Sequence, residues 1–129
     1  MPLNHAEHWQ WRLHMAQVIA AHLDGNRFGV VACYIFGSTK NATAGPASDI
    51  DLLVHTRNTQ AQQAQLHAWL QGWSLCLAEI NAQKTGEHCD SLLDLHYITD
   101  ADIAQGDSFA VKIGAVTDGA RLLPLMSTH

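Results

Sequence analysis

The sequence predicts a small α/β (α+β) domain, in which a mixed β-sheet carries helices mainly on one of its faces. Two observations lead to this fold class: helical and strand patterns alternate along the chain, and the first strand pattern is apolar throughout, as in the centre of a sheet. The helical patterns span residues 6–23 and 59–83, and the strand patterns span residues 30–36, 49–55, 92–99 and 120–123. We expect residues 1–129 to form a single domain, since this length can bury a core without disulfide bonds.

The composition excludes several classes of protein. Hydrophobic residues make up 47% and charged residues 15% of the chain, so it is too apolar to be disordered. No unbroken apolar run approaches the roughly 18 residues that cross a bilayer, so we expect no membrane association. A net charge of −5 argues against binding of nucleic acid through bulk charge. The three cysteines form no CxxC pair and the N-terminal residues lack a secretory signal pattern, which predicts a cytoplasmic protein.

The first two elements are a helix and a buried strand. Residues 6–23 place apolar side chains at helical spacing, and Asp24-Gly25-Asn26 is predicted to end the helix. The expected apolar stripe consists of Trp9, Leu13, Ala16 or Ala20, and Ile19 or Leu23. The run Val30–Phe36 is rich in β-branched and aromatic residues and lies between two glycines, which predicts a strand in the middle of the sheet.

The second strand pattern, residues 49–55, alternates between apolar and polar side chains. Successive side chains of a strand point to opposite faces. One face therefore receives Ile50, Leu52 and Val54, and the other receives Asp49, Asp51 and His55. A long helix is predicted over residues 59–83, with Asn58 or Thr59 as its N-cap and Gly72 as a point where it could break.

The last third of the chain predicts another strand, short helices and an edge strand. In residues 92–99, apolar side chains alternate with Asp94 and His96, so a carboxylate again lies on the polar face. We expect a cap at Thr99 or Asp100 and one or two short helices through Val116. Asp118-Gly119 should then turn the chain into an edge strand over residues 120–123.

Carboxylates on two strands predict a metal site. Asp49 and Asp51 project side by side, and at about 4 Å with an effective dielectric constant near 20 they would repel by roughly 4 kcal/mol. Protonation or a cation relieves such repulsion, and in an open cleft at neutral pH we favour Mg²⁺. Asp94 on the neighbouring strand would complete the ligand set of a two-metal site for in-line displacement at phosphorus.

The residues before this strand are suited to a phosphate. Gly37 lets the backbone approach an anion closely, and the Ser38 hydroxyl with the amides that follow at a helix start can donate to phosphate oxygens. Lys40 adds a positive charge close by. An anion site beside a cation site suits a metal-bound nucleoside triphosphate.

In order and spacing, these segments resemble the signature of the minimal nucleotidyltransferases of the DNA polymerase β superfamily. That signature is a strand ending in Gly-Ser, a ten-residue spacer, and Asp-x-Asp opening the next strand, matched here by Gly37-Ser38 and Asp49-Ile50-Asp51. The resemblance implies transfer of a nucleoside monophosphate, commonly AMP from ATP, to a hydroxyl group. It assigns Mg²⁺ to Asp49 and Asp51, makes Asp94 a third ligand and a base, and gives Gly37 and Ser38 the phosphate contact.

The same resemblance implies a protein partner. It points to small bacterial forms encoded beside a helical protein of the HEPN type, which the nucleotidyltransferase modifies as an antitoxin. The family often has Ala-Arg-Gly after Gly-Ser, whereas this chain has Lys40-Asn41-Ala42, so the role of the usual arginine passes to Lys40 or is lost. The alternative is therefore a binding module that neutralises its partner by contact alone. An aminoglycoside-modifying enzyme is disfavoured because such enzymes usually carry an additional helical domain, and homo-oligomerisation is left open.

Other chemically suggestive groups receive plainer interpretations. The His5 and His8 pair and the cluster His88-Cys89-Asp90 do not match a four-ligand zinc pattern. The four tryptophans, Trp9, Trp11, Trp69 and Trp73, are interpreted as core and interface packing. His96 shares the face of Asp94 and either orients a substrate or packs beside the cleft.

Overall fold

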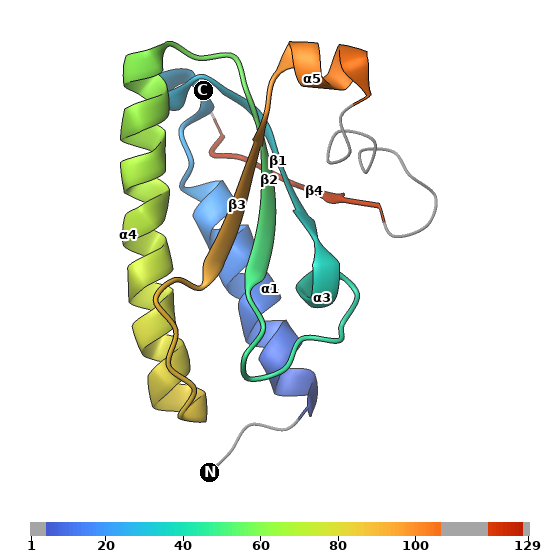
Figure 1. Cartoon of the computed structure of the whole chain (residues 1–129), viewed down its shortest axis with the longest axis vertical. Helices are drawn as coiled ribbons and strands as arrows, with labels where there is room; N and C mark the ends of the chain where they lie inside the picture. Colours follow the sequence, from blue (N-terminus) through green and yellow to red (C-terminus); the bar gives the residue numbers. More distant parts are fainter. Residues whose placement is uncertain (1–4, 107–118, 128–129) are drawn as a thin grey trace.

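The structure, a computed structural model, describes residues 5–106 and 119–127 (Figure 1). The helices are α1 (His5–Ala21), α2 (Gly25–Phe28), α3 (Gly37–Lys40), α4 (Gln60–Thr85) and α5 (Asp100–Gln105). The strands are β1 (Val30–Phe36), β2 (Ile50–Thr56), β3 (Leu93–Ile98) and β4 (Arg121–Leu123). Among these described helices, none combines the length and apolar character that crossing a membrane requires.

The four strands form one mixed sheet in the order β3-β2-β1-β4. β1 pairs antiparallel with β2 and with β4, whereas β2 and β3 run parallel. Because parallel neighbours need a crossover connection, the chain passes through the long helix α4 between β2 and β3. This arrangement confirms the predicted fold class, including the central position of β1 and the edge position of β4.

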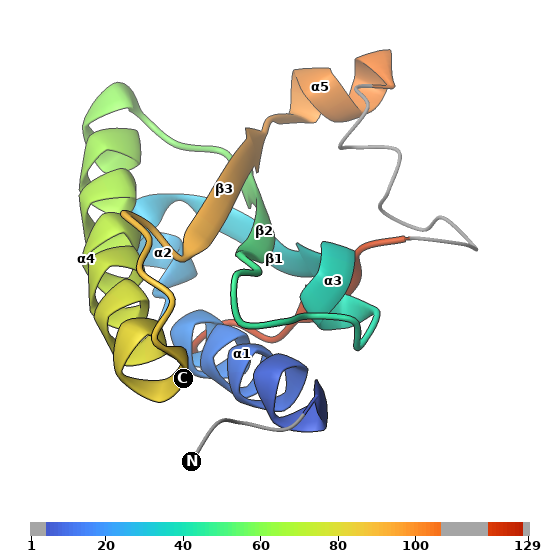
Figure 2. The ribbon, with the colours of Figure 1, turned by 60° about the horizontal axis from the view of Figure 1, so that its bottom comes forward.

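Both long helices pack against the same face of the sheet (Figure 2). The main core joins buried apolar side chains of α1 and α4 to those of the inner strands. Its members include Ala16, Ile19, Leu23, Cys33, Ile35, Ile50, Leu52, Val54, Leu66, Leu70 and Leu77. Burial of this face leaves the opposite face of β2 and β3 to carry the polar side chains.

Most element boundaries agree with the sequence patterns to within one or two residues. Thr59 caps α4 in a capping box with Gln62, and the helix continues without a break through Gly72. Thr99 caps α5 in the same way with Asp102. The helical stretch predicted beyond Gly106 lies outside the described residues. The cysteines Cys33, Cys76 and Cys89 are all free.

Of the two short helices α2 and α3, α2 was missed by the sequence patterns, whereas a helix start at Gly37-Ser38 was expected. The segment predicted to stop the first helix also begins α2, because the Asp24 carboxylate accepts hydrogen bonds from the amides of Asn26 and Arg27. Gly29 ends α2 in a left-handed conformation, which glycine adopts at low cost. The second short helix, α3, begins at Gly37 directly after β1, where a helix start was expected.

The predicted apolar stripe of α1 is rotated relative to the buried face. Ala16, Ile19 and Leu23 are fully buried, as expected, but Trp9 and Leu13 are only partly buried. Their expected place is taken by two polar residues, His8 and Arg12, which are 8% and 0% exposed. The first half of α1 therefore buries a charged side chain rather than an apolar one.

Candidate metal and nucleotide site

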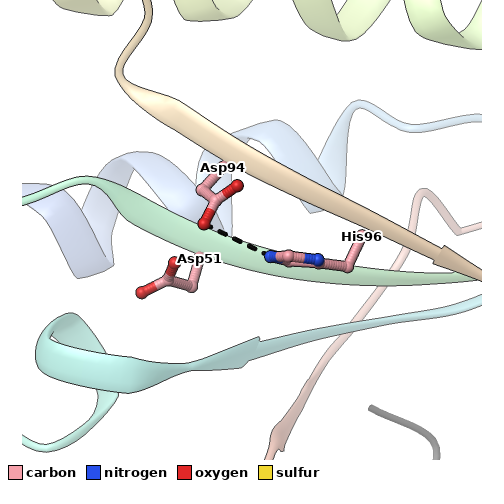
Figure 3. Close-up of side chains that lie close together, drawn as sticks. All are labelled: Asp51, Asp94 and His96. Carbon is pink, nitrogen blue, oxygen red and sulfur yellow. Dashed lines mark ion pairs between the residues drawn. The ribbon is translucent and has the colours of Figure 1, made fainter. Parts of the chain in front are cut away.

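The site is built on the parallel pair of strands β2 and β3. The register places Asp51 directly opposite Asp94, and His96 follows Asp94 on the same face of β3. Figure 3 shows these three side chains converging from the two strands. One ligand atom from each lies within 4.8 Å of those of the other two, and His96 Nε2 lies 3.2 Å from Asp94 Oδ2.

A buried serine of α4 helps to set this register. The Ser74 hydroxyl oxygen accepts a hydrogen bond from the amide of Leu93 at 3.0 Å, and it also bonds the Ser91 hydroxyl. The amide of Ile50 donates to the carbonyl of Leu92 at 2.8 Å. This bond aligns the start of β2 with the start of β3. The position of Asp94 relative to Asp51 therefore depends on contacts made one residue earlier in each strand.

Asp49 lies just before β2 and is not part of the group of three. Its side chain is exposed, whereas that of Asp51 is partly buried. Burial and the nearby charge of Asp94 raise the pKa of Asp49, and the positive charge of Arg12 opposes that shift. The structure thus brings Asp51 and Asp94 together as predicted, adds His96, and leaves Asp49 at the margin within electrostatic reach.

Gly37 packs against Asp51. The register pairs Phe36 of β1 with Asp51, so the end of β1 meets the start of β2. Gly37 has a φ of 72°, and a Cβ atom at this position would collide with the Asp51 carboxylate. Ser38 and Lys40 belong to the same short helix, α3, and both are partly buried. A side chain at residue 37 would displace a carboxylate of the site, which explains why glycine stands there.

The site concentrates negative charge, which is unfavourable. Burial, a hydrogen bond to Asp94, and the charges of Asp94 and Asp49 together raise the pKa of Asp51 to about 7, while His96 acts in the opposite sense. A proton shared between Asp51 and Asp94 therefore partly neutralises the negative charge, as a bound cation would. Two carboxylates and an imidazole are a donor set that fits a divalent metal ion.

The sequence analysis missed a buried arginine that holds the loop before Asp49. Arg12 donates from Nε to the carbonyl of Ser48 at 3.0 Å, and from Nη2 to the carbonyl of Pro46 at 3.3 Å and to Asn81 Oδ1 at 2.8 Å. Asn81 Nδ2 in turn donates to the carbonyl of Pro46 at 3.0 Å. Side chains of α1 and α4 thus hold the backbone that directly precedes Asp49.

The nearby negative charges compensate only in part for the burial of Arg12. Burial lowers the pKa of Arg12, and the charges of Cys89 and Asp49 partly offset this shift. A signal was present in the sequence, because Arg12 stands four residues before Ala16 and so falls on the buried face of the helical pattern. A charged residue in that position indicates a buried hydrogen-bond network.

Comparison with known families identifies the class of protein. The model of the family described as Polymerase beta, Nucleotidyltransferase matches residues 17–104, which is more than half of the chain. The protein therefore belongs to this nucleotidyltransferase family. The match spans Gly37, Asp51 and Asp94, whereas Arg12 lies before it. No curated protein and no solved structure gives a significant match to the chain.

Removing the Asn81 side chain should weaken metal binding more than an equivalent change elsewhere. Asn81→Ala removes the bonds to Pro46 and Arg12, so we expect unfolding to become easier by about 1–3 kcal/mol and Mn²⁺ affinity to fall roughly tenfold. Asn58→Ala is the matched control, since Asn58 anchors Phe28 and Gln63 at the opposite end of β2. Calorimetric titration should show normal affinity in the control, and equal affinity in both variants would contradict the assigned role of Asn81.

The charge conflict at Asp51 predicts an unusual dependence of stability on pH. Because the folded state raises this pKa from 3.8 to about 7, the metal-free protein should lose stability as pH rises through that interval. Asp51→Asn should therefore be more stable than wild type at pH 8 without metal, by about 1–2 kcal/mol once solvent screening is allowed for. The two proteins should converge near pH 4, and Mg²⁺ should stabilise only the wild type.

Denaturant titrations at pH 4, 6 and 8, each with and without Mg²⁺, measure both effects. A destabilised Asp51→Asn at pH 8 without metal, or a difference that does not change with pH, would show that Asp51 and Asp94 do not conflict in the folded protein.

Proposed function

We propose that the protein is a divalent-metal-dependent nucleotidyltransferase that transfers a nucleoside monophosphate, AMP from ATP, to a hydroxyl group of a protein partner. The observation that carries this proposal is the placement of Asp51 opposite Asp94, with Gly37 packed against Asp51. This places the Gly-Ser segment beside two paired carboxylates, which is the combination that a metal-bound triphosphate needs. Membership of the nucleotidyltransferase family supports the same class of reaction.

Each residue has a role in the proposed reaction. Asp49, Asp51 and Asp94 would hold Mg²⁺, two ions in the full arrangement, and the metal would supply positive charge to the phosphates. Gly37 and Ser38 would contact phosphate oxygens, with Lys40 adding charge. The acceptor oxygen forms a bond to the α-phosphorus, the bond from that phosphorus to the bridging oxygen breaks, and pyrophosphate leaves. Asp94, whose side chain is 49% exposed, would accept the proton of the hydroxyl.

The acceptor is proposed to be a separate protein. The described elements form one sheet with its helices, and every strand of the described residues belongs to that sheet. In this proposal the sheet and its helices supply the catalytic core, and a partner supplies the hydroxyl. By family resemblance we propose a helical HEPN-type partner that the protein modifies as a cytoplasmic antitoxin.

One observation favours a second candidate function. Lys40-Asn41-Ala42 stands where related proteins often carry an arginine, and Asn41 and Ala42 bring no charge to the loop. A protein with the same fold and weak or no catalysis would act as a binding module that neutralises its partner by contact. The two candidates differ in whether the partner becomes covalently modified.

Labelling of the co-purified partner decides between them. With α-labelled ATP and Mg²⁺ we expect label on the partner, together with an added nucleotide mass. The labelling rate should fall by at least about 100-fold in Asp51→Asn and Asp94→Asn. The matched control is Asp90→Asn, which changes an exposed carboxylate in the loop before β3 and should leave the activity unchanged. An unlabelled but stably bound partner would support the binding module. The absence of both label and nucleotide binding would reject the enzyme.

A further inference from the structure

We propose that His96 is a direct ligand of the metal ion held by Asp51 and Asp94, and that the site therefore prefers a divalent transition-metal ion to Mg²⁺. This inference rests on the metal site of the proposed function and adds its selectivity. The assignment starts from position. His96 lies two residues after Asp94 on β3, so its side chain points to the same face of the sheet.

The distances suit coordination of one ion. Atoms that bind one divalent ion at about 2.0–2.2 Å lie within roughly 4.4 Å of one another. His96 Nε2 lies 3.2 Å from Asp94 Oδ2, and the group with Asp51 spans at most 4.8 Å. Only small side-chain adjustments would bring all three atoms to one centre.

The imidazole is held in place by its surroundings. Its ring lies 5.5 Å from the ring of Phe36, measured between centroids, and its side chain is 24% exposed. Phe36 directly precedes Gly37, so the end of β1 packs against both Asp51 and His96. A ring restrained in this way loses little freedom on binding a metal ion.

Ligand chemistry sets the direction of the preference. Mg²⁺ binds oxygen donors and keeps several waters, so an imidazole contributes little to its affinity. Transition-metal ions bind a mixed nitrogen and oxygen set more tightly, in the order that rises from Mn²⁺ towards Cu²⁺. Two carboxylates with one histidine therefore favour such ions over Mg²⁺ more strongly than three carboxylates would.

The plain alternative is that His96 only donates a hydrogen bond to the Asp94 carboxylate. Electron spin echo measurements on the full chain loaded with Mn²⁺ separate the two cases, because they detect nitrogen bound directly to the ion. We expect nitrogen modulation in the wild type and its loss in His96→Gln. His67→Gln is the matched control, since His67 Nδ1 contacts the hydroxyl of Tyr97, the next residue of β3, at 2.9 Å.

Competition between the ions tests the selectivity. The Mg²⁺ concentration that displaces half of the bound Mn²⁺ should fall at least about tenfold in His96→Gln and also in His96→Asp, which restores an oxygen ligand. The second variant keeps the test valid if the first does not fold.

Two outcomes overturn the inference. Bound Mn²⁺ without nitrogen modulation in the wild type, or modulation that persists in both variants, would show that His96 is not a ligand while the proposed reaction still stands. If Mn²⁺ does not bind at all, or binding is unaffected by Asp51→Asn, the proposed function fails together with the inference.

Discussion

The pairing of Asp51 with Asp94 across two parallel strands is the constraint on which the rest of the site depends. The backbone register places Asp51 opposite Asp94, so the two residues cannot separate without disrupting the sheet. Burial of Asp51 and its proximity to Asp94 raise the pKa of Asp51 to about 7. The fold thus retains an unfavourable charge arrangement that a bound cation would relieve, as expected where function opposes stability.

Several parts of the structure maintain this arrangement. Ser74 of α4 bonds the start of β3, while Arg12 and Asn81 hold the backbone before Asp49. Gly37 leaves room for the Asp51 carboxylate, which a larger residue would push aside. These contacts come from α1, α3 and α4, so elements from three regions of the chain determine where two carboxylates lie.

Much of this arrangement could be predicted from the sequence, because it depends on local patterns. Alternation in residues 49–55 and 92–99 identified the strand faces of Asp51 and Asp94, and the Gly-Ser spacing identified the segment beside them. The helical position of Arg12 signalled its burial, but its partners could not be predicted, since its acceptors include the carbonyl of Ser48 and the amide oxygen of Asn81, which are distant in the chain. The marginal place of Asp49 was missed for a related reason, because strand alternation does not show where β2 begins.

A crystal structure with Mn²⁺ and a non-hydrolysable ATP analogue would test the central claim most directly. The account predicts an anomalous scattering peak in contact with both Asp51 and Asp94, with the triphosphate lying along Gly37 and Ser38. A peak bound elsewhere, such as at the exposed Asp100 at the far end of the sheet, or a nucleotide bound away from Gly37, would contradict it.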